Sequence, residues 1–241
     1  MWLRSAKGES VREKIKVILF VALGVLVVGL VIYNASLPPK PTDFSQKAWH
    51  EAMTLGNASA ENHFIVYTDI FCPYCDNFSR AWADNEEEFR RDYIDNNKIY
   101  LEYRLTDIIS DHSPNAERGG EGGYCAAKQG AFWEYYRTML DKLQKDYHSK
   151  GIGVSKTSPK IPELDDAYFV EPAKAVARLD VAQFESCMNS HETLPELKQN
   201  TAKAGAVVNG SVPYFVFNDF VTSGFGGDWA TVKMMFKAGG V

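Results

Sequence analysis

The chain has 241 residues, of which 45% are hydrophobic, 13% aromatic and 24% charged. This composition is typical of a globular protein with a well-filled core and excludes a disordered or fibrous chain. The formal net charge of −5 argues against a protein that binds nucleic acid by neutralising phosphates, so we expect no nucleic-acid partner.

The N-terminal segment has the pattern of a membrane anchor. Residues 1–16 hold five basic and two acidic residues, and no charged residue follows until Lys40. As a helix, Ile15–Tyr33 would extend over roughly 28 Å, close to the hydrocarbon thickness of a bilayer. A cleaved signal peptide is the alternative, but its apolar core is usually about 7–15 residues long, and no small-residue cleavage site follows here. The positive-inside rule places residues 1–14 in the cytoplasm, residues 15–33 in the lipid bilayer of the cell membrane, and the single-pass protein's remaining residues outside.

The segment after the anchor predicts the start of an α/β domain. A tether with three prolines covers residues 34–43. Within residues 44–105 we expect a helix at 44–55, a buried strand at His63–Asp69, a helix at Pro73–Tyr93 and a strand at Lys98–Leu105. Strand, helix and strand in this order favour an α/β sheet.

Residues 106–191 predict a helical insertion into this domain. A glycine-rich segment at 113–123 is expected to be a loop, and helices are expected at 124–143, 168–178 and 181–190. The α/β pattern returns at residues 192–241, where we expect a helix at 194–204, a hairpin at 213–223 and a last helix at 229–237.

Cys72-Pro73-Tyr74-Cys75 directly follows the first predicted strand and opens a helix. The unpaired amides and the dipole at a helix N-terminus stabilise a thiolate, so we expect Cys72 to be the nucleophile and Cys75 the resolving thiol. Half of a structural zinc site is the alternative, but it needs a second cysteine pair, and Cys125 and Cys187 lie 62 residues apart. We therefore predict a redox dithiol, with no metal and no cofactor.

Cys125 and Cys187 are expected to form a structural disulfide within the insertion. Four cysteines allow three pairings, and Cys72–Cys75 is the natural local pair. Two buried free cysteines that act as small apolar residues are the alternative.

Thr68–Cys75 resembles the active-site segment of the DsbA family, the extracytoplasmic thiol–disulfide oxidoreductases with a thioredoxin fold. Four further segments are similar to that family: Gly56-Asn57, Cys125–Trp133, Phe184–Cys187 and Asn209–Phe215. The resemblance implies a thioredoxin-like fold with an inserted helical domain and a cis peptide bond between Val212 and Pro213. It also implies that Pro73, Tyr74, Val212, Pro213 and Tyr214 bind substrate.

Two positions depart from the family pattern. Tyr74 stands where the strong oxidants of the family have histidine, and Val66 stands where many thioredoxin-fold proteins have a buried acid. The nearest acid is Asp69, which is a candidate for proton transfer.

These observations favour an enzyme that passes its Cys72–Cys75 disulfide to reduced or unfolded exported proteins and is reoxidised by a membrane redox partner. A reductase or isomerase on the same fold is the first alternative. A chaperone or adaptor that only binds extended chains is the second, and retention of both cysteines counts against it.

Overall fold

The computed structural model describes residues 11–36, 50–207 and 211–241. The chain divides into two units, Met1–Pro41 and Thr42–Val241. In the first unit, helix α1 covers Val11–Ser36, so the start of the predicted tether is helical, and its residues 37–43 lie outside the described part.

A search of the described residues finds no helix that is both long enough and apolar enough to cross a membrane. The membrane span predicted for residues 15–33 is therefore not confirmed, and the side chains of residues 30–33 lie outside the described part.

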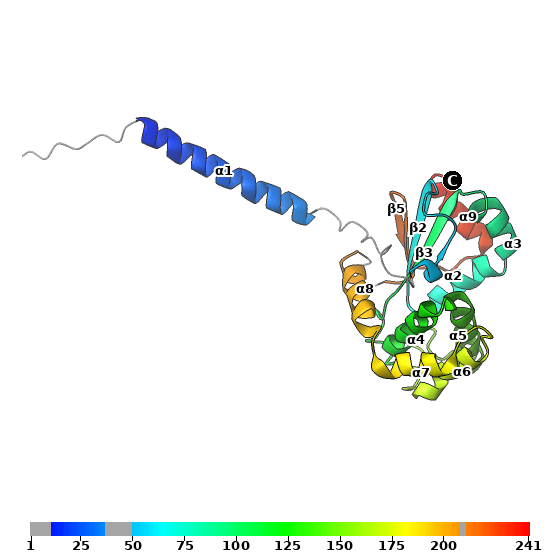
Figure 1. Ribbon diagram of the computed structural model, residues 1–241. Coiled ribbons are helices and arrows are strands. Elements are labelled where there is room, and N and C mark those ends of the chain that lie inside the picture. The colour runs from blue at the N-terminus through cyan, green and yellow to red at the C-terminus, as the bar shows by residue number, and fades with distance from the viewer. Residues whose placement is uncertain (1–10, 37–49, 208–210) are drawn as a thin grey trace, which may run out of the picture. The chain divides into compact units, whose positions relative to one another are not determined.

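The second unit is built on a mixed five-stranded sheet with the order β1-β3-β2-β4-β5 (Figure 1). The strands are β1 (Thr54–Leu55), β2 (Asn62–Thr68), β3 (Ile99–Leu105), β4 (Tyr214–Phe217) and β5 (Phe220–Ser223). Strands β2 and β3 are parallel, and every other neighbouring pair is antiparallel. The central strands are rich in β-branched and aromatic residues, which pack well on a pleated surface.

The two faces of β2 face different helices. Phe64 packs against Phe78 of α2 (Pro73–Ala83) and Phe236 of α9 (Trp229–Ala238), with ring centroids 5.9 and 5.5 Å apart. On the opposite face, Ile65 and Tyr67 belong to a buried cluster that includes Ala204 of α8 (Leu194–Val207). In Figure 1, α2, α3 (Glu86–Phe89) and α9 lie on one side of the sheet and α8 on the other.

Four helices between β3 and α8 gather beside one end of the sheet (Figure 1). They are α4 (Ala116–Lys128), α5 (Phe132–Asp146), α6 (Asp166–Lys174) and α7 (Val181–Ser190). The Cys125–Cys187 disulfide joins α4 to α7, with a Cα–Cα distance of 5.8 Å. The expected pairing is thus present, and the alternative of two free cysteines is wrong.

The glycine-rich segment at 113–123 is not the loop that the sequence predicts, because α4 begins at Ala116 and runs through all four of its glycines. A Cβ at Gly119 would lie 2.7 Å from the Phe71 ring, and a Cβ at Gly123 would lie 2.4 Å from Leu105. Packing on several sides outweighs the poor helix propensity of glycine. The predicted helix at 124–143 is accordingly two helices, α4 and α5.

Two other predicted helices are interrupted. Residues 44–49 of the expected helix at 44–55 lie outside the described part, Glu51–Met53 form a 3-10 helix, and Thr54–Leu55 pair with β3 as strand β1. The helix expected at 73–93 ends at Ala83 and is followed by α3 and a π-helix at Arg90–Ile94. The pairing of β1 with β3 and the interruption of the predicted helices depend on packing against segments that are distant in sequence, which local sequence patterns do not reveal.

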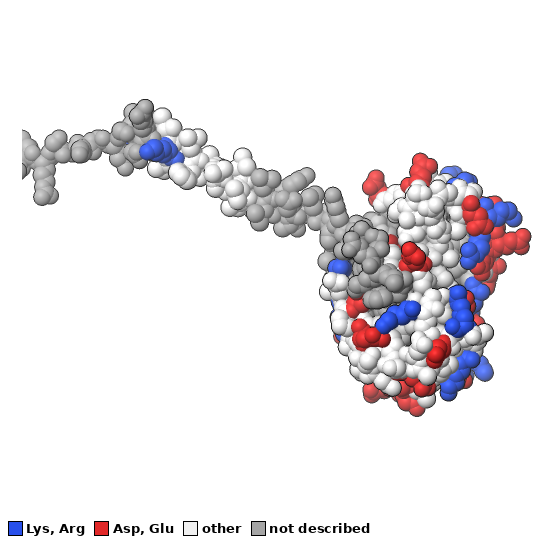
Figure 2. Space-filling model, viewed as in Figure 1, with Lys and Arg blue, Asp and Glu red and all other residues white. Residues whose placement is uncertain are grey.

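Charged side chains of both signs are interspersed over the visible face of the second unit in Figure 2. On this face no broad region of described residues carries a single sign.

We predict that Gly120→Ala destabilises the protein. A Cβ at Gly120 would lie 2.6 and 2.7 Å from the two methyl groups of buried Leu197, so rotation of that side chain does not relieve the clash. Overpacking should lower the free energy of unfolding by about 1–3 kcal/mol, measured by urea denaturation. Gly205→Ala in α8 is the matched control, because its Cβ would meet nothing within 4 Å, and it should raise stability by up to about 1 kcal/mol. Equal effects of the two substitutions would contradict this account of α4.

Candidate active site

The Cys72-Pro73-Tyr74-Cys75 segment follows the short connection from β2 and forms the start of α2. Cys72 is the N-cap residue of α2 in extended conformation, and Pro73 occupies the first helical turn, where its missing N–H costs nothing. Both cysteines are free thiols and both are buried, whereas Tyr74 between them is 46% exposed. Cys72 lines a groove, whereas Cys75 is 1% exposed in the first turn of α2.

The loop before β4 contacts the dithiol. The Val212–Pro213 peptide bond is cis, as the family resemblance implied. The Cys72 thiol donates a hydrogen bond to the Val212 carbonyl oxygen at 3.4 Å. A segment 140 residues away in sequence thus places a backbone carbonyl directly at the sulfur of Cys72.

A groove of about 460 Å³ opens beside Cys72. Its apolar wall is formed by side chains of several segments, including Phe71, Ile108, Ile109, Val154 and Ile161. Lys156 and Lys160 line it as well, and both are exposed. Asp111 lines the groove too, so the groove offers apolar surface beside Cys72 together with charged side chains of both signs.

Burial sets the chemistry of Cys75. Desolvation raises the pKa of its thiol well above the usual value, and the neighbouring Cys72 thiol raises it further. The Asp69 amide donates a hydrogen bond to the sulfur at 3.5 Å, and this amide and the Thr68 hydroxyl both act to lower the pKa. Cys75 is therefore held as a neutral thiol at neutral pH.

Asp69 is fully buried at the end of β2. Its carboxylate accepts hydrogen bonds from the backbone N–H groups of Phe71 at 3.0 Å and Ile109 at 3.4 Å. Desolvation nevertheless raises its pKa to about 7, because these two bonds only partly replace the lost hydration, and nearby Asp107 also raises it. The carboxyl group can thus change its protonation state near neutral pH.

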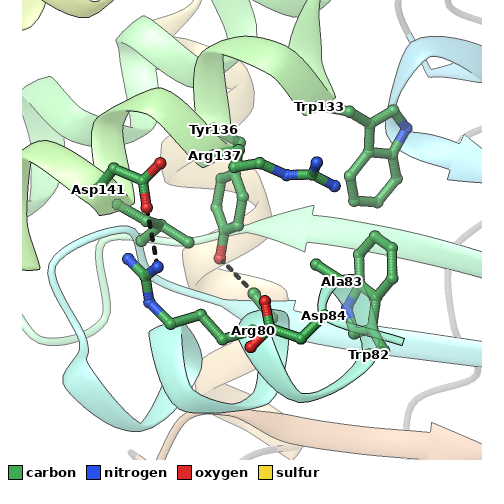
Figure 3. Close-up of a pocket in the computed structure, with 10 residues that line it drawn as sticks. Arg80, Trp82, Ala83, Asp84, Trp133, Tyr136, Arg137 and Asp141 are labelled. Carbon is green, nitrogen blue, oxygen red and sulfur yellow. Dashed lines mark hydrogen bonds and ion pairs between the residues drawn. The ribbon is translucent and has the colours of Figure 1, made fainter. Parts of the chain in front are cut away.

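A second pocket, of about 170 Å³, lies between α2 and α5 (Figure 3). Trp82, Trp133 and Tyr136 line it, and an ion pair between Arg80 and Asp141 with an N–O distance of 2.8 Å stands beside them. In Figure 3 the Tyr136 hydroxyl points toward α2, where it meets Ser79 Oγ at 3.2 Å.

The structure brings most of the predicted site residues together at the groove. Cys72, Pro73, Tyr74 and Val212 all line the groove, and Pro213 is buried next to it in sequence. Tyr214, which was also predicted to bind substrate, is not a lining residue of this groove. Its ring packs against Tyr67 of β2, with centroids 6.2 Å apart.

Sequence reasoning missed the groove wall and the polar groups under the dithiol. Loop residues 108–113 and 153–161 carry no motif, and only the tertiary fold brings them to Cys72. Ser79 could have been found, since it lies four residues after Cys75 and shares a helix face with it. Tyr136 lies 57 residues from Ser79, and no sequence pattern connects it with the cysteines.

A family model described as Thioredoxin matches residues 49–225. The chain belongs to the thioredoxin family. A search of curated protein sequences finds no significant match.

Solved structures share the fold at low sequence identity. BdbD from Bacillus subtilis in the oxidised state is 13% identical with a TM-score of 0.57, covering 78% of this chain and 91% of its own. DsbA from Chlamydia trachomatis is 13% identical with a TM-score of 0.54, covering 84% and 95%. Mycobacterium tuberculosis DsbG, a disulfide bond oxidoreductase in reduced form, is 18% identical with a TM-score of 0.55, covering 77% and 86%. At these identities the likeness establishes the fold alone.

We predict that Asp69 makes stability fall as pH rises. The unfolded chain releases this proton near the usual pKa of 3.8, whereas the folded state holds it up to about pH 7. Between these values the folded state binds more protons, so its stability is lost with rising pH. Asp69→Asn cannot ionise, and its free energy of unfolding relative to the wild type should rise by on the order of 4 kcal/mol from pH 4 to pH 8.

Urea denaturation at pH 4, 6 and 8 measures this difference. Asp111→Asn is the control, since it makes the same change at an exposed aspartate on the groove rim, and it should alter the free energy of unfolding by no more than about 0.5 kcal/mol. Parallel pH profiles for the wild type and Asp69→Asn would contradict the assignment.

Proposed function

We propose that the protein is an extracytoplasmic thiol–disulfide oxidoreductase that introduces disulfides into exported proteins through Cys72 and Cys75. The proposal rests on one observation above all: the Cys72 sulfur, at the start of α2, lies 3.4 Å from the carbonyl that precedes cis-Pro213 and lines an open groove. Membership of the thioredoxin family supports dithiol chemistry at this position.

In the proposed reaction the enzyme begins with a Cys72–Cys75 disulfide. A substrate thiolate attacks Cys72 Sγ, a new disulfide forms between them, and the Cys75 sulfur leaves with the electron pair and takes up a proton. The second substrate cysteine then attacks the mixed disulfide as a thiolate and releases Cys72. The substrate is oxidised by two electrons, and the enzyme is left as the dithiol.

The groove supports an extended protein chain as the substrate. An extended segment needs backbone partners and apolar pockets for its side chains, and the Val212 carbonyl and the wall around Ile109 and Ile161 supply both. Substrates of this class are reduced, unfolded proteins.

The direction of the reaction depends on which redox state the protein favours. Stabilisation of the Cys72 thiolate at the helix N-terminus would favour the dithiol and make the disulfide a stronger oxidant. A membrane redox partner would then reoxidise the dithiol. A reductase or isomerase on the same fold is the competing proposal, and it requires that the protein favour the disulfide over the dithiol.

We also propose that the catalytic unit faces the outside of the cell membrane. The basic residues before Val17, the uncharged segment up to Pro39 and the Cys125–Cys187 disulfide support this location, because structural disulfides persist in oxidising compartments.

The reduction potential of the Cys72/Cys75 couple against glutathione tests the function. We expect a value nearer about −120 mV than about −270 mV, which are the potentials of a strong oxidant and of a typical reductant. Cys72→Ser should abolish the oxidation of a reduced, unfolded protein substrate, whereas Cys125→Ala with Cys187→Ala should leave the potential unchanged. A potential near −270 mV would favour the reductase, and full activity of Cys72→Ser would favour a non-redox chaperone.

The redox state of Cys125 and Cys187 inside cells tests the location. In a Cys72→Ser, Cys75→Ser background, acid trapping followed by maleimide labelling should find no free thiol in the full chain. Deletion of residues 1–33 should leave both thiols free, because the protein then stays in the reducing cytoplasm. Free thiols in the full chain would contradict the proposed location. Extraction at alkaline pH reports separately on the bilayer, and release of the full chain into the supernatant would contradict an uncleaved anchor.

A further inference from the structure

Two loops line the groove beside Cys72 and carry charged side chains. Lys156 and Lys160 lie on the loop 153–161, and Asp111 lies on the other loop. All three residues are exposed. The groove thus holds two positive charges against one negative charge, on a chain whose formal net charge is −5. The excess charge beside Cys72 is therefore opposite in sign to that of the whole chain.

The charged groups of the groove are not paired with each other. Within the residues that the structure describes, Lys156, Lys160 and Asp111 form no ion pair. Other lysines of the second unit are paired with carboxylates: Lys128, Lys142, Lys198 and Lys233. His112 also lines the groove, and it adds positive charge only when it is protonated. The two groove lysines are therefore available to a ligand of negative charge.

The loop 153–161 is ordered by its own hydrogen bonds. The Gly153 amide donates to the Pro159 carbonyl at 2.7 Å, which closes the loop at its base. At its tip the Ser155 amide donates to Ser158 Oγ, and the Ser158 amide donates to Ser155 Oγ, each at 3.1 Å. Both lysines are thus carried on a closed turn of defined shape.

Buried residues fix this loop to its surroundings. Ile161 is 4% exposed and packs against Gly153, where an added Cβ would lie 2.8 Å from it. Asn115 is buried as well, and its side chain donates to the Pro162 carbonyl and accepts from the Leu164 amide, both at 2.8 Å. Because Asn115 is the residue before α4, the exit of the loop is tied to the helical block. A pre-ordered loop of this kind loses little conformational entropy when a ligand binds.

We infer that the groove selects protein segments that carry acidic side chains beside the reacting cysteine, and that Lys156 and Lys160 select them. The inference rests on the proposed function and names the substrate class of the same site. Apolar side chains of the segment would contact the wall that includes Val154 and Ile161, and a carboxylate would lie near the lysines. The lysines act on binding, and the disulfide exchange at Cys72 is the one already described.

The weakness of attraction between exposed charges sets the form of the expected effect. An exposed ion pair contributes little, and salt screens it, because the Debye length is about 10 Å at 0.1 M ionic strength. Charges at the rim of an interface change mainly the association rate and its dependence on salt. The selection should therefore appear in the second-order rate constant of substrate oxidation and disappear at high salt.

Oxidation of designed peptides by the full chain measures this selection. Each reduced peptide carries two cysteines in a glycine–serine sequence, flanked by glutamate, glutamine or lysine. In a single turnover the peptide consumes the Cys72–Cys75 disulfide, which is followed by acid quenching, alkylation and mass spectrometry. Neighbouring charges also alter the reactivity of the peptide thiol itself. Each rate constant is therefore divided by that of the same peptide with 2-hydroxyethyl disulfide, which is neutral.

We expect the normalised rate constant of the glutamate peptide to exceed that of the lysine peptide by about three- to tenfold at low salt, with the glutamine peptide between them. At about 0.5 M salt this ratio should fall towards one. Lys156→Gln with Lys160→Gln should bring the ratio near one at low salt, and Lys156→Glu with Lys160→Glu should invert it. Because the ratio compares two peptides on one variant, a general loss of activity does not change it.

Lys174→Glu with Lys237→Glu is the matched control. Both residues are exposed and neither is a lining residue of the groove, and the double substitution changes the net charge by the same amount. The ratio should stay at the wild-type value in this variant. Asp111→Asn removes the negative charge from the groove and should raise the ratio.

Each outcome decides between the explanations. A wild-type ratio of one, or a faster reaction of the lysine peptide, would overturn the inference. Equal ratios in the groove variants and in the control would overturn it too, because the effect would then come from the net charge of the chain. A wild-type protein whose Cys72–Cys75 disulfide is consumed by none of the peptides would overturn the proposed function itself.

Discussion

The burial of one sulfur is the constraint on which the rest of the site depends. Four residues separate the end of β2 from the start of α2, so Cys72 is the N-cap residue and lines the groove, whereas Cys75 is buried in the first turn of α2. Loss of hydration raises the Cys75 pKa, so the two thiols have different roles although they are three residues apart.

The close approach of α4 brings the helical block to this sulfur. Gly119 lies against the ring of Phe71, the residue before Cys72, and Gly123 lies against Leu105 at the end of β3. A helix with side chains at these positions could not come so near. The close packing lets α5 place Tyr136 beside Thr68, and it lets the loop at 153–161 form one wall of the groove. The insertion is thus part of the site.

The thioredoxin family is shown by sequence, while the shared fold extends to proteins only 13–18% identical. At that identity the likeness concerns the fold alone. In this chain, Val66 leaves no acid at its position of β2, Asp69 is tied to two backbone amides, and Tyr74 is exposed between the cysteines. The cis peptide bond between Val212 and Pro213 lies beside this dithiol, with the Val212 carbonyl oxygen 3.4 Å from the Cys72 sulfur.

The sequence alone determined the dithiol and its position between strand and helix, because a local motif and local periodicity specify both. It also identified the Cys125–Cys187 pair and the loop before β4. It misassigned the glycines of α4, since their helical state depends on Phe71, Leu105 and other partners distant in the chain. Only the tertiary structure decided which loops border Cys72, where the Asp69 carboxyl group points, and that hydroxyl groups from β2, α2 and α5 meet. Such contacts arise from packing between distant segments, which no pattern within one segment encodes.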